Sequence, residues 1–466
     1  MTDLSFSTAL CAALGLALTG CAAPPPARIE ASAAPQWHAS QPHDGELGSL
    51  QAWWSQFDDP LLAHLVTAAQ AASPTLATAT ANIADARAAR VTGGAVLLPA
   101  LDAGASASRS RAQAGAPLAS QTSASVQASW ELDLFGALRA GANAAQARVE
   151  AREADWHEAR VSVAAEVASG YADLRACERQ AQQLDADARS RELVADVSDA
   201  AARVGVRSTA SADLARASAA DGYMALLQQQ AQCALLVKSL VALTAEEEMA
   251  LRRQLTAQTA RLPRPREFAV AGVPAALLAQ RPDVRAAERE VVAASAEVKQ
   301  AAARRWPRVT LAGMLGATRT TSLGLANDGG VWTLGPVTVT LPLFDAGVRR
   351  ANTDAARARH VAALKTFEAR LRTAIQEVES ALVTLQSAAQ RGGSAQSAVD
   401  SHERAYHATA ASHAAGAASL FELEDARRGL LLAQTTRNAL ERERLAAWIS
   451  LYRAAGGGWR PNTPVH

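Results

Sequence analysis

The sequence predicts an α+β chain with an internal two-fold repeat, in which each copy joins a β-hairpin to a long antiparallel helical hairpin. Three observations carry this prediction. The sequence matches itself at a nearly constant offset, its prolines are confined to a few stretches, and two short stretches in each copy alternate in polarity. The chain has 46 Lys and Arg against 45 Asp and Glu. Because this balance gives no electrostatic preference for a polyanion, no nucleic-acid partner is expected.

The repeat is visible as an ordered series of matches along the chain. Pro74 aligns with Pro282 at an offset of 208 residues, and Gly205 aligns with Gly416 at an offset of 211. Chance does not produce such an order. We therefore predict these parts in chain order: a signal peptide at 1–20, a lipidated N-terminal strap at 21–59, the first repeat at 60–245, an equatorial linker at 246–276, the second repeat at 277–455 and a C-terminal tail at 456–466.

Each repeat contains a long stretch without proline, 118–262 in the first and 343–460 in the second. Helix interiors exclude proline at about 3 kcal/mol, and both stretches show apolar residues at heptad spacing. A continuous helix from Phe135 to Gly205 would have about 68 residues and reach about 100 Å. Because glycine tolerates the left-handed conformation that ends helices, we expect the helical hairpins to turn near Gly205 and near Gly416.

Between the first helix of each repeat and its long hairpin, the polarity period changes to two. The stretches at about 97–135 and about 305–344 alternate between apolar and polar residues, which predicts one β-hairpin in each repeat. Gly335-Pro336 shifts the phase of the last strand, so we expect a β-bulge there. Alternation alone is equally compatible with a soluble sheet that has one solvated face.

The number of strands limits what such a sheet can do in a membrane. After the N-terminal region no stretch offers 18 uncharged apolar residues, so any membrane-spanning part of the mature chain has to be β. Four strands cannot close a barrel, and open edges would leave backbone groups unpaired in hydrocarbon. If these strands span lipid, several chains have to share one barrel.

The N-terminus resembles that of a bacterial lipoprotein. An uncharged apolar run from Leu10 to Leu18 is too short to span a bilayer but fits a secretory signal peptide. It leads into Leu18-Thr19-Gly20-Cys21, which is similar to the lipobox, whose cysteine is acylated and becomes the mature N-terminus. One feature departs from the pattern, because no Lys or Arg precedes Arg28. We expect a covalent lipid on Cys21.

Two further cysteines lie at equal distances from the first predicted turn. Cys177 precedes Gly205 by 28 residues and Cys233 follows it by 28, so an antiparallel hairpin places them at the same level. An exported protein meets an oxidising compartment, which favours a disulfide between them. Two buried free thiols remain the alternative, because the side chains also have to face each other.

The sequence shows no pattern that would support catalysis. The nine histidines are scattered, and there is no His-Glu-x-x-His, no Cys-x-x-Cys and no phosphate-binding Gly-Lys-Ser loop. We therefore predict no catalytic residue, no metal site and no cofactor, and the chain is not expected to be an enzyme.

Several ordered motifs resemble those of one known family. Trp130-Glu131-Leu132-Asp133-Leu134-Phe135-Gly136, Arg281-Pro282-Asp283-Val284 and Leu341-Pro342-Leu343-Phe344-Asp345 are similar to signatures of the outer-membrane factors of tripartite efflux pumps, in the TolC-like lipoprotein branch typified by OprM and NodT. The resemblance implies a homotrimer with a shared 12-stranded transmembrane β-barrel and a coiled-coil periplasmic tunnel. It also implies a lipid-anchored protein of the outer membrane that works with a periplasmic adaptor (membrane fusion) protein and an inner-membrane pump. The function it implies is that of a passive exit channel that serves an RND-type pump and conducts drugs or other toxic small molecules.

The resemblance also suggests where the channel is gated. In related proteins acidic rings constrict the tunnel just after the second helical turn, and alignment on Gly416 brings Glu422 and Asp425 to those places. Their spacing of three puts them on one helix face. The alternative is structural, because Ser419 followed by Glu422 is typical of a capping box. Both interpretations stay open, and both can hold.

Two other functions remain. The same duct could serve type I protein secretion, in which case the partner pump would differ. A periplasmic coiled-coil lipoprotein that braces the envelope without a pore is the second alternative, although the two β-hairpins have no evident use in a brace.

Overall fold

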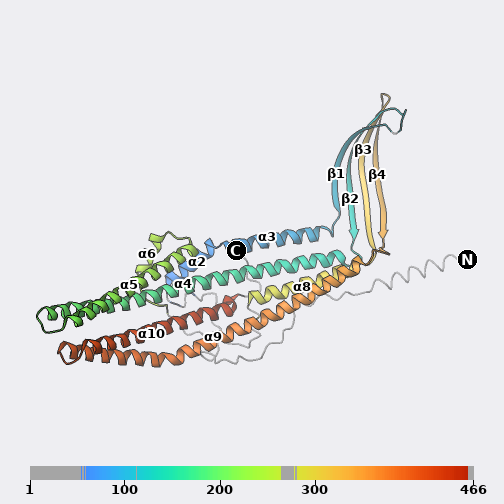
Figure 1. The fold of residues 1–466 in the computed structure, drawn as a ribbon. Helices are drawn as coiled ribbons and strands as arrows, with labels where there is room; N and C mark the ends of the chain where they lie inside the picture. The colour runs from blue at the N-terminus through green and yellow to red at the C-terminus, as the bar shows by residue number, and fades with distance from the viewer. Residues whose placement is uncertain are drawn as a thin grey trace. The chain divides into compact units, whose positions relative to one another are not determined.

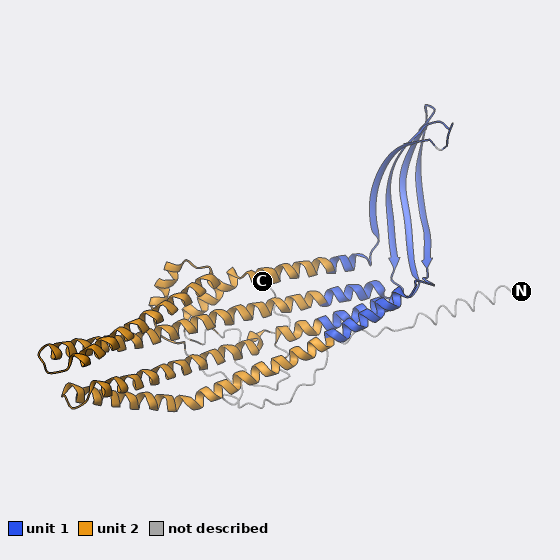
Figure 2. Cartoon of the chain, viewed as in Figure 1, with its two compact units in different colours: residues 1–30, 90–147, 290–363 blue, residues 31–89, 148–289, 364–466 orange. Residues whose placement is uncertain are grey.

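The computed structural model describes residues 59–111, 113–263 and 281–459, together with Trp54, Phe57 and Leu278. The predicted lipidation site Cys21, the signal peptide and most of the N-terminal strap lie outside the described residues. The chain divides into two compact units. Unit 1 comprises residues 1–30, 90–147 and 290–363, and unit 2 comprises residues 31–89, 148–289 and 364–466 (Figure 2).

Helices make up most of the described chain (Figure 1). They are α2 (Pro60–Ala72), α3 (Pro74–Ala95), α4 (Ala137–Arg203), α5 (Thr209–Thr244), α6 (Glu248–Thr256), α8 (Pro282–Ala303), α9 (Val348–Ala414), α10 (Leu420–Ala454) and the 3-10 helix η3 (Gly456–Gly458). Corresponding helices of the two repeats have nearly the same length. α3 and α8 have 22 residues each, α4 and α9 have 67 each, and α5 and α10 have 36 and 35. No helix among the described residues is both long enough and apolar enough to cross a membrane.

Both helical hairpins turn at a glycine and restart at a serine. Gly205 has φ 72° and Gly416 has φ 75°, a left-handed conformation that glycine adopts without a steric penalty. Ser208 then caps α5 by accepting a hydrogen bond from the Ser211 amide, and Ser419 caps α10 in the same way. The sequence prediction put the turns near the same two glycines.

The main core of unit 2 lies where α2, α4, α5, α6, α9 and α10 pack together. Tyr171 and Leu174 on α4 are fully buried there with Leu382 on α9 and Leu451 on α10. The Tyr171 hydroxyl donates a 2.7 Å hydrogen bond to Asp59, whose carboxylate also caps α2. Burying apolar side chains at heptad spacing stabilises each hairpin by about 25 cal/mol for each Å² removed from water.

A disulfide joins the two helices of the first hairpin. Cys177 on α4 and Cys233 on α5 are bonded, with their Cα atoms 5.6 Å apart and 56 residues between them in sequence. The second hairpin has no corresponding cysteines. A covalent link therefore ties α4 to α5, whereas α9 and α10 are held together by packing and by non-covalent polar contacts such as the ion pair between Arg391 and Glu443.

Unit 1 contains a four-stranded antiparallel sheet in the order β1-β2-β3-β4 (Figure 1). Its strands are β1 (Ala100–Ser110), β2 (Ala119–Leu132), β3 (Arg308–Ser322) and β4 (Leu325–Thr340). β1 and β2 come from the first repeat and β3 and β4 from the second, and the pairing of β2 with β3 joins the repeats into one sheet. The predicted bulge is confirmed: Gly335 and Pro336 on β4 lie opposite the single residue Ala312 on β3.

Candidate channel-lining sheet and hairpin tips

One face of the sheet is apolar across all four strands. In an antiparallel sheet, residues that pair across strands project to the same face. The register therefore groups the apolar residues into rows. From one end to the other the rows are Leu132, Val309 and Val339; Trp130, Leu311 and Val337; Leu101, Ala128, Gly313 and Leu334; Ala103, Val126, Leu315 and Trp332; and Ala105, Ala124, Ala317 and Gly330.

The large side chains of this apolar face are exposed in the single chain. Leu315 is 68% exposed, Trp332 74% and Leu334 82%. The rows run from Val309 to Ala317, eight residue steps, or about 27 Å along the strand. That length matches the apolar band of an outer-membrane strand. The band ends at an ion pair between Arg319 and Asp328, whose charged atoms lie 3.5 Å apart.

The opposite face of the sheet is polar. Ser106 and Ser123 share a 2.8 Å hydrogen bond across β1 and β2, and Gln121 donates to Thr318 at 3.4 Å across β2 and β3. A depression of about 450 Å³ lies over this polar surface. An apolar face backed by a hydrogen-bonding face is the pattern of a wall between hydrocarbon and a watery lumen.

Both outer edges of the sheet are unpaired within the described chain. β1 pairs with β2 alone and β4 pairs with β3 alone. Each edge therefore presents a row of backbone N–H and C=O groups that could pair with another strand.

A carboxylate follows each hairpin and caps the long helix after it. Asp133 accepts hydrogen bonds from the Leu138 and Arg139 amides at 3.0 and 2.9 Å, and the Arg139 guanidinium pairs with it at 3.0 Å. Burial alone would raise the pKa of Asp133, but these hydrogen bonds lower it below its ordinary value. At the start of α9, Asp345 accepts hydrogen bonds from the Gly347 and Arg349 amides at 3.0 and 3.1 Å and pairs with the Arg349 guanidinium at 2.8 Å. The two family motifs around these aspartates thus have a structural role at the strand-to-helix junction.

The acidic gate candidates lie at the start of α10 and are exposed. Glu422 completes the capping box: its amide donates to the Ser419 hydroxyl at 3.2 Å, and its carboxylate accepts from the Ser419 amide at 2.6 Å. The hydrogen bonds from the Ser419 amide and hydroxyl lower the pKa of Glu422, so its carboxylate stays ionised near neutral pH. Asp425 lies three residues further along α10 and is also exposed. The capping role is therefore present, and the gate role stays a prediction.

A buried network of charges, which the sequence reasoning missed, joins the two helical hairpins near their tips. Arg427 on α10 is 3% exposed and pairs with Glu424, with Asp187 of α4 at 3.7 Å, and with the hydroxyl of Ser190 at 3.1 Å. Arg191 of α4 pairs with Asp187 at 2.7 Å. The sequence does show the two pairs within one helix, Asp187 with Arg191 at i,i+4 spacing and Glu424 with Arg427 at i,i+3 spacing. Such pairs usually lie on the solvated surface of a helix, so their spacing does not indicate burial.

The described residues contain no group of three His, Cys, Asp or Glu side chains arranged to hold a metal ion. The predicted site residues do not form one centre. Gly205, Gly416, Glu422 and Asp425 lie at or next to the hairpin turns, and Cys177 and Cys233 lie along the first hairpin.

Comparison with known proteins agrees with this architecture. A family model described as "Outer membrane efflux protein" matches residues 65–246 and 273–457. The pyoverdine export outer membrane protein OpmQ of Pseudomonas putida is 30% identical over 97% of each chain, and the toluene efflux pump outer membrane protein TtgI of the same species is 27% identical over 91% of this chain and 92% of its own. The solved structure of the outer-membrane channel OprN has a TM-score of 0.85 at 28% identity and covers 94% of this chain and all of its own. The Campylobacter jejuni CmeC channel, at 22% identity and a TM-score of 0.82 over 94% of each chain, shares the fold.

Proposed function

The chain belongs to the outer membrane efflux protein family, and on this premise we propose that it is the passive exit channel of a tripartite efflux pump of the RND type. It conducts small molecules such as drugs or other toxic compounds and carries out no chemistry of its own. The observation that supports this proposal most directly is the four-stranded sheet, with its apolar face, its polar face and its two unpaired edges.

The unpaired edges require partners if the sheet spans lipid, because hydrocarbon offers no hydrogen bonds to backbone groups. We propose that three chains each give four strands to one 12-stranded barrel. Because the four strands alternate in direction, β1 of one chain runs antiparallel to β4 of the next, and the ring closes with every neighbouring pair antiparallel. The apolar faces meet lipid, the polar faces line the lumen, and the long helical hairpins form the wall of a periplasmic tunnel.

The tunnel mouth is proposed to carry the acidic gate. With three-fold symmetry, Glu422 and Asp425 supply six carboxylates around a narrow opening, which attracts cations. The exposed position of both side chains and the ionised state of Glu422 support this role.

The channel is proposed to work with an inner-membrane pump, which supplies the energy, and with a periplasmic adaptor protein, which couples the two. Relatives of this chain are named for the export of pyoverdine and toluene, so a small-molecule cargo is favoured over a protein cargo. Sensitivity of a deletion strain to a panel of drugs, solvents and siderophores identifies the cargo class. Restored secretion of a protein without any change in resistance would point to type I secretion instead.

Acylation of Cys21 is proposed to anchor the mature chain in the outer membrane. Mass analysis of the mature N-terminal peptide should show a diacylglyceryl group and an added acyl chain on this residue. A Cys21→Ala variant should lose both, and an unmodified N-terminus in the intact protein would refute the anchor.

A pair of adjacent substitutions tests which face of the sheet meets lipid. Leu315 lies on the apolar face and Met314, its neighbour on β3, lies on the polar face. Leu315→Lys places a charge in hydrocarbon at a cost of at most about 2–4 kcal/mol and should weaken assembly. Met314→Lys should assemble and shift the ion selectivity of single channels in planar bilayers. Equal tolerance of both variants, or purified protein that stays monomeric and does not conduct, would refute the proposal.

A further inference from the structure

We propose that a pocket at the strand-to-helix junction of unit 1 binds the phosphate headgroup of an anionic phospholipid from the periplasmic leaflet of the outer membrane. This inference rests on the proposed function, because it requires the sheet to span that membrane. The pocket has a volume of about 330 Å³ and is lined by residues from the ends of α8, β2 and β4 and from the starts of β3, α4 and α9.

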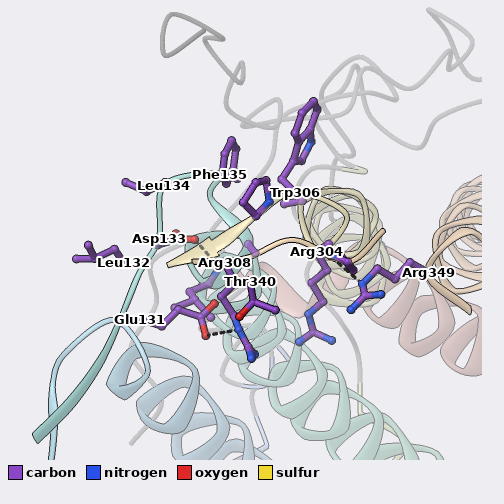
Figure 3. Close-up of a pocket in the computed structure, with 15 residues that line it drawn as sticks. Glu131, Leu132, Asp133, Leu134, Phe135, Arg304, Trp306, Arg308, Thr340 and Arg349 are labelled. Atoms are coloured by element: carbon purple, nitrogen blue, oxygen red, sulfur yellow. Dashed lines mark hydrogen bonds and ion pairs between the residues drawn. The ribbon is translucent and has the colours of Figure 1, made fainter. Parts of the chain in front are cut away.

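One wall of the pocket is apolar and aromatic. Phe135 and Trp306 stack with their ring centroids 5.6 Å apart, and Trp306 is 60% exposed (Figure 3). Leu132 pairs with Val309 and so belongs to the end row of the apolar face of the sheet, whereas Glu131, Arg308 and Thr340 lie on the polar face. The pocket therefore lies where the apolar band ends, which is the headgroup level at which tryptophan is enriched in membrane proteins.

A second wall carries guanidinium groups. Arg304 and Arg349 line the pocket from the helix ends, and Figure 3 shows them on a different side from the aromatic pair. Arg308 lines it from the polar face of the sheet. The Arg349 Nε donates to the Arg304 carbonyl oxygen at 3.1 Å, which keeps this arginine beside the end of α8.

The carboxylates around the pocket leave one of these cations without a counter-ion. Asp133 is engaged by Arg139, and Asp345 by Arg349. The Arg308 Nε lies 3.8 Å from Glu131, a long contact for a charged pair. Arg304 has no carboxylate within ion-pair distance among the described residues, and its side chain is exposed. A site with an unneutralised guanidinium beside exposed aromatic and leucine side chains suits an anionic group that carries an apolar tail.

A phosphodiester attached to acyl chains meets both requirements. Arginine binds phosphate oxygens through parallel N–H···O bonds, and basic pockets next to membrane-spanning segments hold anionic lipid headgroups. The acyl chains would continue along the apolar face of the sheet, next to Leu132 and Trp130. A free phosphate ion would satisfy the guanidinium but would gain nothing from the aromatic wall.

Native mass spectrometry of the full-length protein in detergent tests the site, with dioleoyl phosphatidylglycerol and dioleoyl phosphatidylcholine as probes. The wild-type protein should bind the anionic lipid more tightly than the zwitterionic one. Arg304→Gln should weaken phosphatidylglycerol binding about fivefold, because one arginine near an anionic lipid contributes about that factor. The matched control is Arg305→Gln, which removes the same charge from the next residue, outside the pocket, and should change binding less than twofold.

Three results would overturn the inference. They are equal losses in the two variants, no preference for phosphatidylglycerol in the wild-type protein, and complete displacement of the lipid by millimolar inorganic phosphate, which would identify a free-anion site. Single-channel conductance of the wild-type and Arg305→Gln preparations separates this inference from the proposed function. Conduction without lipid preference refutes only the lipid site, whereas absence of conduction refutes the channel itself.

Discussion

Replacing Arg427 with leucine tests whether the buried charge network holds the two helical hairpins together. The side chains of Arg427, Asp187 and Glu424 are 4%, 6% and 11% exposed. The substitution leaves both carboxylates buried without this counter-ion, and breaking a buried pair costs about 3–5 kcal/mol. Because Arg191 still lies 2.7 Å from Asp187 and 3.9 Å from Glu424, we expect the lower part of that range, about 3 kcal/mol.

Urea denaturation of the detergent-solubilised protein, followed by circular dichroism at 222 nm, measures this loss. The matched control is Arg216→Leu on α5, where a 58% exposed arginine pairs with the 66% exposed Asp213. Exposed pairs contribute about 0–1 kcal/mol, so the control should unfold nearly as the wild type does. Adding Glu424→Leu to Arg427→Leu should restore part of the stability, because it removes one of the stranded carboxylates.

The same substitution has a functional readout. The network links α4 of the first hairpin to α10 of the second, so its loss should lengthen the open time of single channels in planar bilayers. Equal destabilisation by Arg427→Leu and Arg216→Leu would show that burial of the network does not contribute to stability. Unchanged open times would show that the network does not influence opening of the proposed channel.

Three further predictions follow from the described residues. Peptides prepared without reductant should contain Cys177 linked to Cys233. Replacing both cysteines with serine should lower the free energy of unfolding by about 4 kcal/mol, because the bond closes a loop between residues 56 positions apart. Two free thiols in the exported protein would contradict this. Burial raises the pKa of Glu158 from 4.5 to about 7, with Asp283 acting in the same direction and Arg281, Ser162 and Arg453 against it. The folded state therefore holds this proton more tightly than the unfolded state, and stability should fall by at most about 3 kcal/mol as the pH rises from 4.5 to 7. Glu158→Gln should flatten that dependence in denaturation curves at pH 5 and pH 8, and an unchanged slope would assign it to other groups. Combining Glu422→Gln with Asp425→Asn should weaken the block of single-channel current by multivalent cations, and identical block in the variant would exclude these residues from the gate.

The sequence was most informative where backbone chemistry decides the structure. Proline-free stretches and two glycines indicated long helical hairpins, and the structure has α4 ending at Arg203, just before Gly205. Strict alternation around Val126 and Leu315 indicated strands, and the phase shift at Gly335-Pro336 indicated the bulge. These signals are local, so a single sequence carries them.

Features that depend on tertiary contacts were less accessible. The pairing of β2 with β3 brings together residues about 200 positions apart, and no local pattern fixes that register. Asp187 and Arg427 are of residue types that are usually exposed, and they are buried because the two helical hairpins meet there. Glu422 shows a further limit of prediction from sequence. A glutamate three residues after Ser419 is expected both for a capping box and for an acidic ring, so its position does not distinguish the two roles.

The pairing of β2 with β3 has an evolutionary consequence. This seam joins the two halves of the chain edge to edge, with the same antiparallel geometry as the hairpins on either side. A polypeptide of half the length would offer the same two edges, so six such polypeptides could occupy the places of the three full chains in the proposed barrel. Fusion of two half-length genes would fix the pairing of β2 with β3 within one chain and would let the sequence of each half diverge independently. The cysteine pair is present in only the first hairpin, which is a difference of the kind that such divergence allows.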